Sequence, residues 1–300
     1  LFERALDNLG EALKEFQQGI PASQYTDGDN AARNGHMHIV KHVATKFTER
    51  ALPLAASQGH LDVVVYLHEN RSDGATTEAM DAAATFGHLR VVKWLHENRT
   101  EGCTVRAMDG ASRNGHLEVL KFLRANRTEG ATSAAIDLAA GAGRLEVVKW
   151  ITENMPDLSA SVAAMDGAAA AGCLDVVQYL HDHRSEGCTT EAMDMAAKNG
   201  HLEVVKFLHR HREEGCSVVA MNAAAAGAHM EVLEFLSSNR QEGCNEYAMI
   251  LASWHGHLNV VKWLHENRAE GCTTSAMNGA AYNGHIDVVK WLHYNRAEVC

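Results

Sequence analysis

Residues 189–216 read TTEAMDMAAKNGHLEVVKFLHRHREEGC, and variants of this 28-residue stretch recur along the chain. A Gly-His step marks the middle of the copies at Gly35-His36, Gly59-His60, Gly87-His88, Gly115-His116, Gly200-His201, Gly256-His257 and Gly284-His285. Related steps stand at Gly143-Arg144, Gly172-Cys173 and Ala228-His229. The second residue of the step recurs every 28 residues, with one interval of 24 and one of 29. A fixed period of this size predicts a solenoid of stacked repeats.

Each copy has the pattern of two short helices joined by a turn. An apolar stripe at i, i+1, i+4 and i+5 indicates the first helix and comprises Ala192, Met193, Ala196 and Ala197. Thr189 or Thr190 can cap this helix, and Asn199-Gly200 ends it because glycine tolerates the left-handed conformation. The second helix is predicted from Leu202 to about His211, with residues 212–215 as the return loop. Its inward side chains are expected to be Leu202, Val204, Val205 and Leu208.

The phrase AAxNGHLEVVKxL closely resembles the core of the ankyrin repeat, and residues 198–206 are its best copy. The resemblance covers almost everything from Asp29 to Arg296 and implies an all-α, right-handed ankyrin-like solenoid of stacked helix-turn-helix repeats. Ankyrin repeats usually have a period of about 33 residues and a T-P-L-H opening. Here the opening is xAMD, as in Ala79-Met80-Asp81. Because about five residues are missing where ankyrin units project a β-hairpin finger, we expect a short tight loop instead.

Two segments depart from the repeat. Residues 1–25 carry a helical apolar stripe and then the breaker Ile20-Pro21, which predicts an N-terminal capping helix region or, alternatively, the last helix of a preceding repeat or domain. About ten ankyrin-like repeats then occupy residues 26–300. Within residues 152–160, Met155 replaces the arginine found in the other return loops, and this unit holds one extra residue. A hinge or a change of superhelix direction fits this irregular joint, and so does neutral variation in a loop that tolerates insertion.

The composition restricts the partners and the compartment. The formal net charge of −11 argues against nucleic acid, whose binding proteins usually present a basic face. No apolar run approaches transmembrane length and no signal peptide is visible, so we expect no membrane contact. Seven cysteines, an odd number, favour a reducing compartment, and we expect a cytoplasmic monomer. The chain begins at Leu1 rather than at Met, so we expect it to be a segment of a longer protein.

Side chains able to do chemistry fall into repeat columns rather than into sites. Most of the nineteen histidines occupy either the turn or the end of the second helix, where we expect them to bond to the backbone. Six cysteines share one column with alanine, which indicates a need for small size: Cys103, Cys188, Cys216, Cys244, Cys272 and Cys300. There is no Cys-x-x-Cys pair, no G-x-S-x-G elbow and no phosphate-binding loop. We therefore expect no metal site, no cofactor and no catalytic residue.

The return loops hold an arginine and a glutamate two residues apart, as in Arg99 with Glu101 and Arg268 with Glu270. We expect each pair to form an ion pair across the turn and, being exposed, to contribute about 0–1 kcal/mol.

Candidate binding residues lie where the copies disagree, because positions buried in every unit look alike. The variable slots are the two residues before the Gly of the turn and the pair before Ala-Met. Both slots lie on the first helix, which the resemblance places on the concave side of the stack. The side chains there that are typical of binding hot spots are Phe86, Arg106, Arg113, Tyr247, Trp254, His255 and Tyr282. Trp254 and Tyr282 could instead pack on neighbouring repeats.

The expected function is a scaffold that binds a protein partner through its concave face. Two alternatives fit the same sequence. The segment could be the recognition arm of a larger protein whose catalytic or targeting domain lies outside it. It could also be a structural assembly subunit whose ends bind neighbours while the groove stays empty.

Overall fold

The computed structural model describes residues 27–42, 46–71, 76–271 and 273–296. Within these ranges every regular element is an α-helix, and one isolated β-bridge joins Asp27 to Lys46. The first helices of the repeats are α2 (Gly28–Arg33), α4 (Ala51–Ser57), α6 (Glu78–Thr85), α8 (Val105–Asn114), α10 (Ala134–Gly141), α12 (Ala163–Ala170), α14 (Thr190–Lys198), α16 (Val218–Ala226), α18 (Glu246–Trp254) and α20 (Thr274–Tyr282). The second helices are α3 (Met37–His42), α5 (Leu61–Asn70), α7 (Leu89–Asn98), α9 (Leu117–Asn126), α11 (Leu145–Asn154), α13 (Leu174–His183), α15 (Leu202–His211), α17 (Met230–Asn239), α19 (Leu258–Asn267) and α21 (Ile286–Asn295). This arrangement confirms the predicted all-α solenoid of helix-turn-helix repeats.

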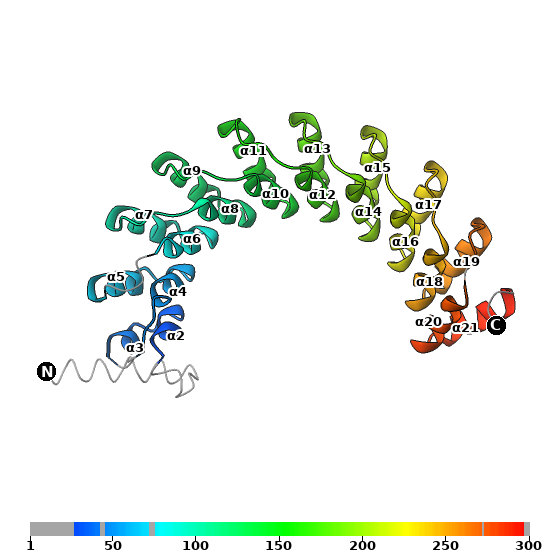
Figure 1. The fold of residues 1–300 in the computed structure, drawn as a ribbon, viewed down its shortest axis with the longest axis horizontal. Coiled ribbons are helices and arrows are strands. Elements are labelled where there is room, and N and C mark those ends of the chain that lie inside the picture. Colours follow the sequence, from blue (N-terminus) through cyan, green and yellow to red (C-terminus); the bar gives the residue numbers. More distant parts are fainter. Residues whose placement is uncertain (1–26, 43–45, 72–75, 272, 297–300) are drawn as a thin grey trace. The chain divides into compact units, whose positions relative to one another are not determined.

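The repeats divide into two compact units. Within each unit successive repeats lie side by side (Figure 1). The N-terminal unit holds the described residues up to Ala139 together with Glu146–Leu158. The C-terminal unit holds Ala140–Leu145 and the described residues from Ser159 onward. Within each unit the first helices form one row and the second helices form another, so each repeat meets only its neighbours in the stack.

Local signals in the sequence set the ends of the helices. Thr189 caps α14, because its hydroxyl accepts a hydrogen bond from the Glu191 N–H at 3.1 Å. At the other end Gly200 has a φ of +76°, and the His201 N–H donates to the Ala196 carbonyl at 2.8 Å. Ala228 has the same place in its repeat and a φ of 56°, the one positive φ of a non-glycine residue among those described. The glycine position of each repeat therefore requires a left-handed backbone conformation, which glycine adopts at the lowest cost.

The core runs along each stack between the two rows of helices. The predicted stripe of α14, from Ala192 to Ala197, is buried, and its four apolar members are each at most 1% exposed. Val204, Val205 and Leu208 of α15 are at most 2% exposed. Leu202, predicted to face inward with them, is only half-buried because it is the first residue of its helix. Small first-helix residues let these helices approach closely: a Cβ on Gly110 would lie 2.2 Å from Thr85 Oγ1.

The connections between repeats are short, as the 28-residue period predicts. In the described part of the chain no β-hairpin finger separates the repeats, and turns and bends replace it. The predicted capping helix region, residues 1–25, lies outside the described residues. No helix that the structure describes has both the length and the hydrophobicity that a bilayer span requires.

Candidate functional site

The histidines of the turn column hold successive repeats together. His88 Nε2 donates to the Ser57 carbonyl at 2.9 Å, and His257 Nε2 donates to the Ala226 carbonyl at 3.0 Å. Each acceptor lies near the end of the first helix in the preceding repeat. The ring also packs against the glycine of that repeat, since a Cβ on Gly59 would lie 2.5 Å from His88 Nδ1. The predicted backbone bonding of this column is confirmed for His88, His257 and His285.

The histidines at the ends of the second helices pack against aromatic rings, so the expectation that they bond to the backbone is wrong. Their rings stand edge-on to an aromatic ring of the next repeat, with centroids 5.1–5.6 Å apart, in His68–Trp94, His96–Phe122, His181–Phe207, His209–Phe235 and His265–Trp291. His68 Nδ1 also accepts a hydrogen bond from Arg99 Nη1 at 3.3 Å. Among the described side chains no three His, Cys, Asp or Glu gather where they could hold a metal ion.

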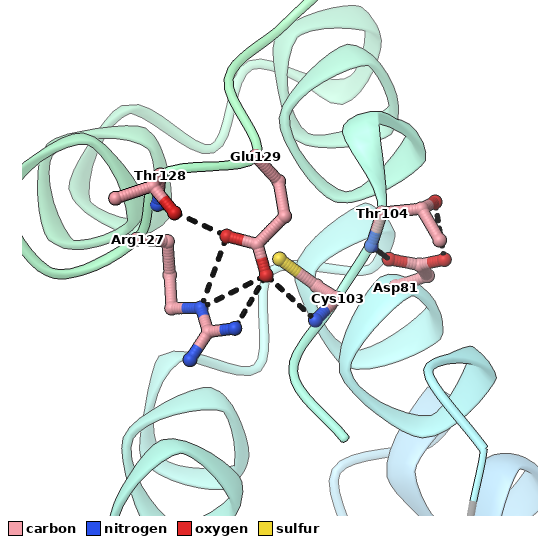
Figure 2. A network of polar contacts seen from close by, with 6 residues as sticks. All are labelled: Asp81, Cys103, Thr104, Arg127, Thr128 and Glu129. Atoms are coloured by element: carbon pink, nitrogen blue, oxygen red, sulfur yellow. Dashed lines mark hydrogen bonds and ion pairs between the residues drawn. The ribbon is translucent and has the colours of Figure 1, made fainter. Parts of the chain in front are cut away.

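A carboxylate in the xAMD opening ties each first helix to the cap of the next one. Both oxygens of Asp81 accept hydrogen bonds from Thr104, one from its N–H and one from its hydroxyl, at 2.7 Å each (Figure 2). Asp194 bonds to Ser217 in the same way, at 2.8 and 2.6 Å. Each capping hydroxyl thus accepts from its own helix and donates to the preceding repeat. This link was not predicted from the sequence, although an Asp followed 23 residues later by Thr or Ser recurs along the chain.

The arginine and glutamate of the return loops form the predicted ion pairs and also reach the preceding repeat. Arg127 donates to both Glu129 oxygens, and Glu129 Oε1 accepts from the Cys103 N–H at 3.3 Å (Figure 2). We call this arrangement, with its equivalents built on Glu186 and Glu214, the loop clasp. The Arg127 and Glu129 side chains are only 23% and 22% exposed. The expectation of freely exposed pairs was therefore wrong, because the neighbouring repeat shields them.

The loop clasp makes the stack sensitive to acid. Hydrogen bonds from the loop arginine lower the pKa of Glu129, Glu186 and Glu214 to about 2, below the ordinary value of 4.5. Since the folded state has the lower pKa, the stabilisation is fully present above about pH 4.5 and is lost as the pH falls toward 2. We expect Glu129→Gln to lower the free energy of unfolding by about 1–2 kcal/mol at pH 7 and by much less at pH 2.5.

Urea titrations followed by circular dichroism at both pH values measure this difference. Glu118→Gln is the matched control, because Glu118 pairs with Lys121 but is 71% exposed. It should change the free energy of unfolding by less than about 0.5 kcal/mol. An equal loss from both substitutions at pH 7 would refute the shielding argument.

The cysteines occupy a buried structural column, as their repetition predicts. Cys103, Cys188, Cys216 and Cys244 are free thiols and at most 8% exposed. Burial raises the pKa of Cys103 to about 12 and that of Cys188 and Cys216 to about 11, so these thiols stay protonated and are poor nucleophiles. Cys272 and Cys300 lie outside the described residues.

The irregular joint interrupts the series of loop clasps. Gly102 has a φ of +74°, and a Cβ on it would meet the Arg127 guanidinium at 2.1 Å. Gly130 has the same φ, but a Cβ there would meet nothing within 4 Å. Met155 stands in the arginine position of the next loop, where the Leu158 N–H donates to its carbonyl at 3.0 Å. A clasp at Gly130 is thus absent from the described residues, and a hinge over residues 152–160 stays a prediction.

In the N-terminal unit, three of the predicted binding residues line one groove. Phe86 is 54% exposed, and Arg106 and Arg113 are exposed beside it. The groove has a volume of about 900 Å³ and runs across first helices from α2 to α10. Arg33 and Arg50 complete its basic rim, and Leu138, 39% exposed, lies in its lining.

The other four predicted residues lie on α18 and α20 or directly after them, in the C-terminal unit. Tyr247 is 55% exposed and His255 is also exposed. Trp254 and Tyr282 stack on each other, with centroids 5.8 Å apart and planes at 25°. The Trp254 ring also covers Gly279, whose Cβ would lie 2.9 Å from Trp254 Cε3. Although Trp254 packs on a neighbouring repeat, both aromatic side chains can still contact a partner, since Trp254 remains 43% and Tyr282 81% exposed.

The exposed side chains of the first helices, which we call the first-helix face, differ between the units. Arg33 and Arg50 were not among the predicted binding residues, although both occupy the variable slots: Arg33 is equivalent to Arg113, and Arg50 lies 28 residues before Glu78. In the C-terminal unit Val218 and Val219 are the pair before Ala-Met, and these valines are 37% and 45% exposed. The N-terminal face is therefore rich in arginine and the C-terminal face is mainly apolar and aromatic.

Two family models match the sequence. A family model described as ankyrin repeats (many copies) matches residues 52–96, 80–124 and 161–209, and one described as ankyrin repeats (3 copies) matches residues 220–300. No curated protein matches the sequence. Among solved structures, the human ASB11 ankyrin repeat domain is similar at a TM-score of 0.40 and 21% identity, over 53% of this chain and 83% of that one. Because the family matches together span more than half of the sequence, the chain belongs to the ankyrin-repeat family.

Proposed function

We propose that the chain is a scaffold that binds a protein partner through its first-helix face. Ankyrin repeats generally mediate protein–protein interactions, which gives the class of function. The observation that carries the proposal is the exposure of large side chains at slots that differ between repeats. Phe86, Tyr247, Trp254 and Tyr282 are between 43% and 81% exposed there, although the stack buries nearly every apolar side chain that its repeats share. Such aromatic side chains dominate binding energy in interfaces.

Binding without catalysis is the second part of the proposal. The histidines and cysteines of the repeat columns serve packing and inter-repeat hydrogen bonds, and burial keeps the thiols protonated. The free buried cysteines also support a reducing compartment such as the cytoplasm. We propose a monomer that binds neither nucleic acid nor membrane, in keeping with its net charge of −11.

Substitution of the aromatic pair tests the proposal. Affinity capture followed by mass spectrometry identifies a partner, and calorimetry then gives its Kd. We expect the Trp254→Ala/Tyr282→Ala variant to bind this partner at least about 30-fold more weakly, since hot-spot truncations cost about 2 kcal/mol or more. Tyr282 is 81% and Trp254 43% exposed, and neither belongs to the buried core, so the fold should persist, as circular dichroism will show.

Tyr294→Ala is the matched control. Tyr294 is 81% exposed, like Tyr282, but it lies on the second helix α21. It should leave the Kd within twofold of wild type. Unchanged binding by the Trp254→Ala/Tyr282→Ala variant, or an equal loss from Tyr294→Ala, would remove the aromatic pair from the interface.

A further inference from the structure

The groove of the N-terminal unit is lined by more arginines than carboxylates, on an otherwise acidic molecule. Four arginines line it, Arg33, Arg50, Arg106 and Arg113, and all four are exposed. Glu78 is the one exposed acidic side chain in its lining. Asp81 and Asp109 also line the groove, which leaves it one net positive charge (four arginines against three carboxylates), and each of these two carboxylates accepts two hydrogen bonds from the following repeat, at 2.7–2.9 Å.

The charges are arranged in two rims set by the helical repeat. Arg50, Glu78 and Arg106 stand 28 residues apart at or beside the starts of α4, α6 and α8. Phe86 lies on the opposite rim, where the first helices end, between Arg33 at the end of α2 and Arg113 at the end of α8. Arg33, Arg50 and Arg106 form no ion pair with another described residue. Their guanidinium groups are thus available to carboxylates, which they bind in a two-pronged geometry.

The length of the groove fits an extended chain. Packed helices lie about 8–10 Å apart, so the distance from α2 to α10 corresponds to about 32–40 Å. An extended peptide advances about 3.3 Å per residue, so about 10–12 residues would cover this length. Phe86 at 54% and Leu138 at 39% exposure give such a peptide two apolar contacts between the arginines.

We propose that this groove binds an extended acidic peptide segment of the partner, with acidic residues flanking a central apolar pair. The inference rests on the proposed function and adds the chemistry of the ligand. The carboxylates pair with Arg50 and Arg106 on one rim and with Arg33 on the other, while the apolar pair covers Phe86. A peptide is favoured over nucleic acid because exposed Phe86 and Leu138 suit apolar side chains. The net charge of −11 also repels a nucleic acid, which is charged at every nucleotide, more than a peptide with a few carboxylates.

Fluorescence anisotropy with a defined probe tests the proposal on the full chain. The probe is a fluorescein-labelled 12-residue peptide with three acidic residues at each end and Leu-Phe at its centre. We expect saturable binding that weakens as salt rises, because exposed charges are screened. Replacing Leu-Phe by Ser-Ser should weaken binding at least fivefold, and replacing the acidic residues by lysine should abolish it. A single-stranded 12-nucleotide DNA should bind more weakly than the peptide.

Charge reversal on the protein locates the site. Arg50→Glu/Arg106→Glu should weaken probe binding at least 10-fold, and Phe86→Ala at least fivefold. Arg124→Glu is the control, because Arg124 is exposed on the second helix α9 and outside the groove, and it should change the Kd less than twofold. Circular dichroism checks that each variant stays folded. Equal losses from the Arg124 and groove variants would overturn the proposal, as would DNA binding as tight as that of the peptide.

The captured partner separates this inference from the proposed function. If Arg50→Glu/Arg106→Glu leaves the Kd for that partner unchanged while Trp254→Ala/Tyr282→Ala weakens it, the acidic-peptide inference fails and the first-helix face still binds. If neither double variant changes the Kd, both proposals fail. If both variants weaken partner binding and the probe binds as expected, both proposals are supported.

Discussion

Gly200→Val is expected to lower the free energy of unfolding by about 3–4 kcal/mol. Gly200 has a φ of +76°, a conformation that costs a non-glycine residue about 1–2 kcal/mol and a β-branched one more. Its Cβ would also lie 2.5 Å from His229 Nδ1, so the added side chain must displace the ring that packs beneath this turn. Urea denaturation followed by circular dichroism gives the loss, with an unchanged slope showing that the unfolded state is comparable.

Gly284→Val separates the two parts of this cost. Gly284 has a φ of +77°, but a Cβ there would meet nothing within 4 Å, so only the backbone strain of about 2 kcal/mol remains. Ala228 shows that the column tolerates a bare Cβ once φ falls to 56°, since His257 still bonds to the Ala226 carbonyl at 3.0 Å. Ala228→Gly should therefore raise stability by about 1 kcal/mol. Equal losses at Gly200 and Gly284 would contradict a role for the ring.

Asp194→Ala is expected to lower the free energy of unfolding by about 2–3 kcal/mol. The Asp194 side chain is 4% exposed, and it accepts hydrogen bonds from the N–H and the hydroxyl of Ser217. Removing the carboxylate leaves both donors shielded from water without a partner, which costs about 1–3 kcal/mol for each group that stays buried. Denaturant titration measures the loss, and hydrogen exchange at the start of α16 should rise with it.

The chain itself contains a neutral version of this link, which supplies the control. Asn222 Nδ2 donates to Asn245 Oδ1 at 2.7 Å, and the Asn245 N–H donates to Asn222 Oδ1 at 3.2 Å. The Asp194→Asn/Ser217→Asn variant should therefore recover most of the stability that Asp194→Ala loses. If the Asn pair were as destabilising as the alanine, the link would depend on the negative charge rather than on the satisfied hydrogen bonds.

Repetition made the fold predictable from the sequence. The Gly200-His201 step marks a left-handed turn in every copy, and the 3.6-residue pattern places Val204, Val205 and Leu208 in the core wherever the phrase recurs. Leu202 is less buried than predicted because helical periodicity does not report the loss of neighbours at a helix end.

Links between repeats were harder to predict than the helices themselves. The bond between Asp81 and Thr104 joins residues 23 apart, in different helices of successive repeats. The 23-residue spacing of the two residues is visible in the sequence, but whether they touch depends on the distance between stacked repeats, which the sequence does not give. The same holds for the loop clasp, in which shielding by the preceding repeat keeps Glu129 only 22% exposed.

The groove shows what the slots alone could not establish. Variation between copies correctly marked Phe86, Arg106 and Arg113 as exposed, because a residue buried in every repeat cannot vary freely. Variation did not reveal that Arg33 and Arg50 line the same groove of about 900 Å³. The interval from His36 to His60 is 24 residues instead of 28, so counting 28 residues does not place Arg33 in register with Arg50 and the later repeats.

Hydroxyl-radical footprinting of the chain with its bound partner tests the central claim most directly. Aromatic side chains react readily with the radical when they are exposed, and Tyr282 and Tyr294 are equally exposed at 81%. The first-helix face predicts that the partner protects Tyr247, Trp254 and Tyr282 and leaves Tyr294 on the second helix as reactive as before. Protection of Tyr294 with Trp254 and Tyr282 unchanged would contradict binding through the first-helix face.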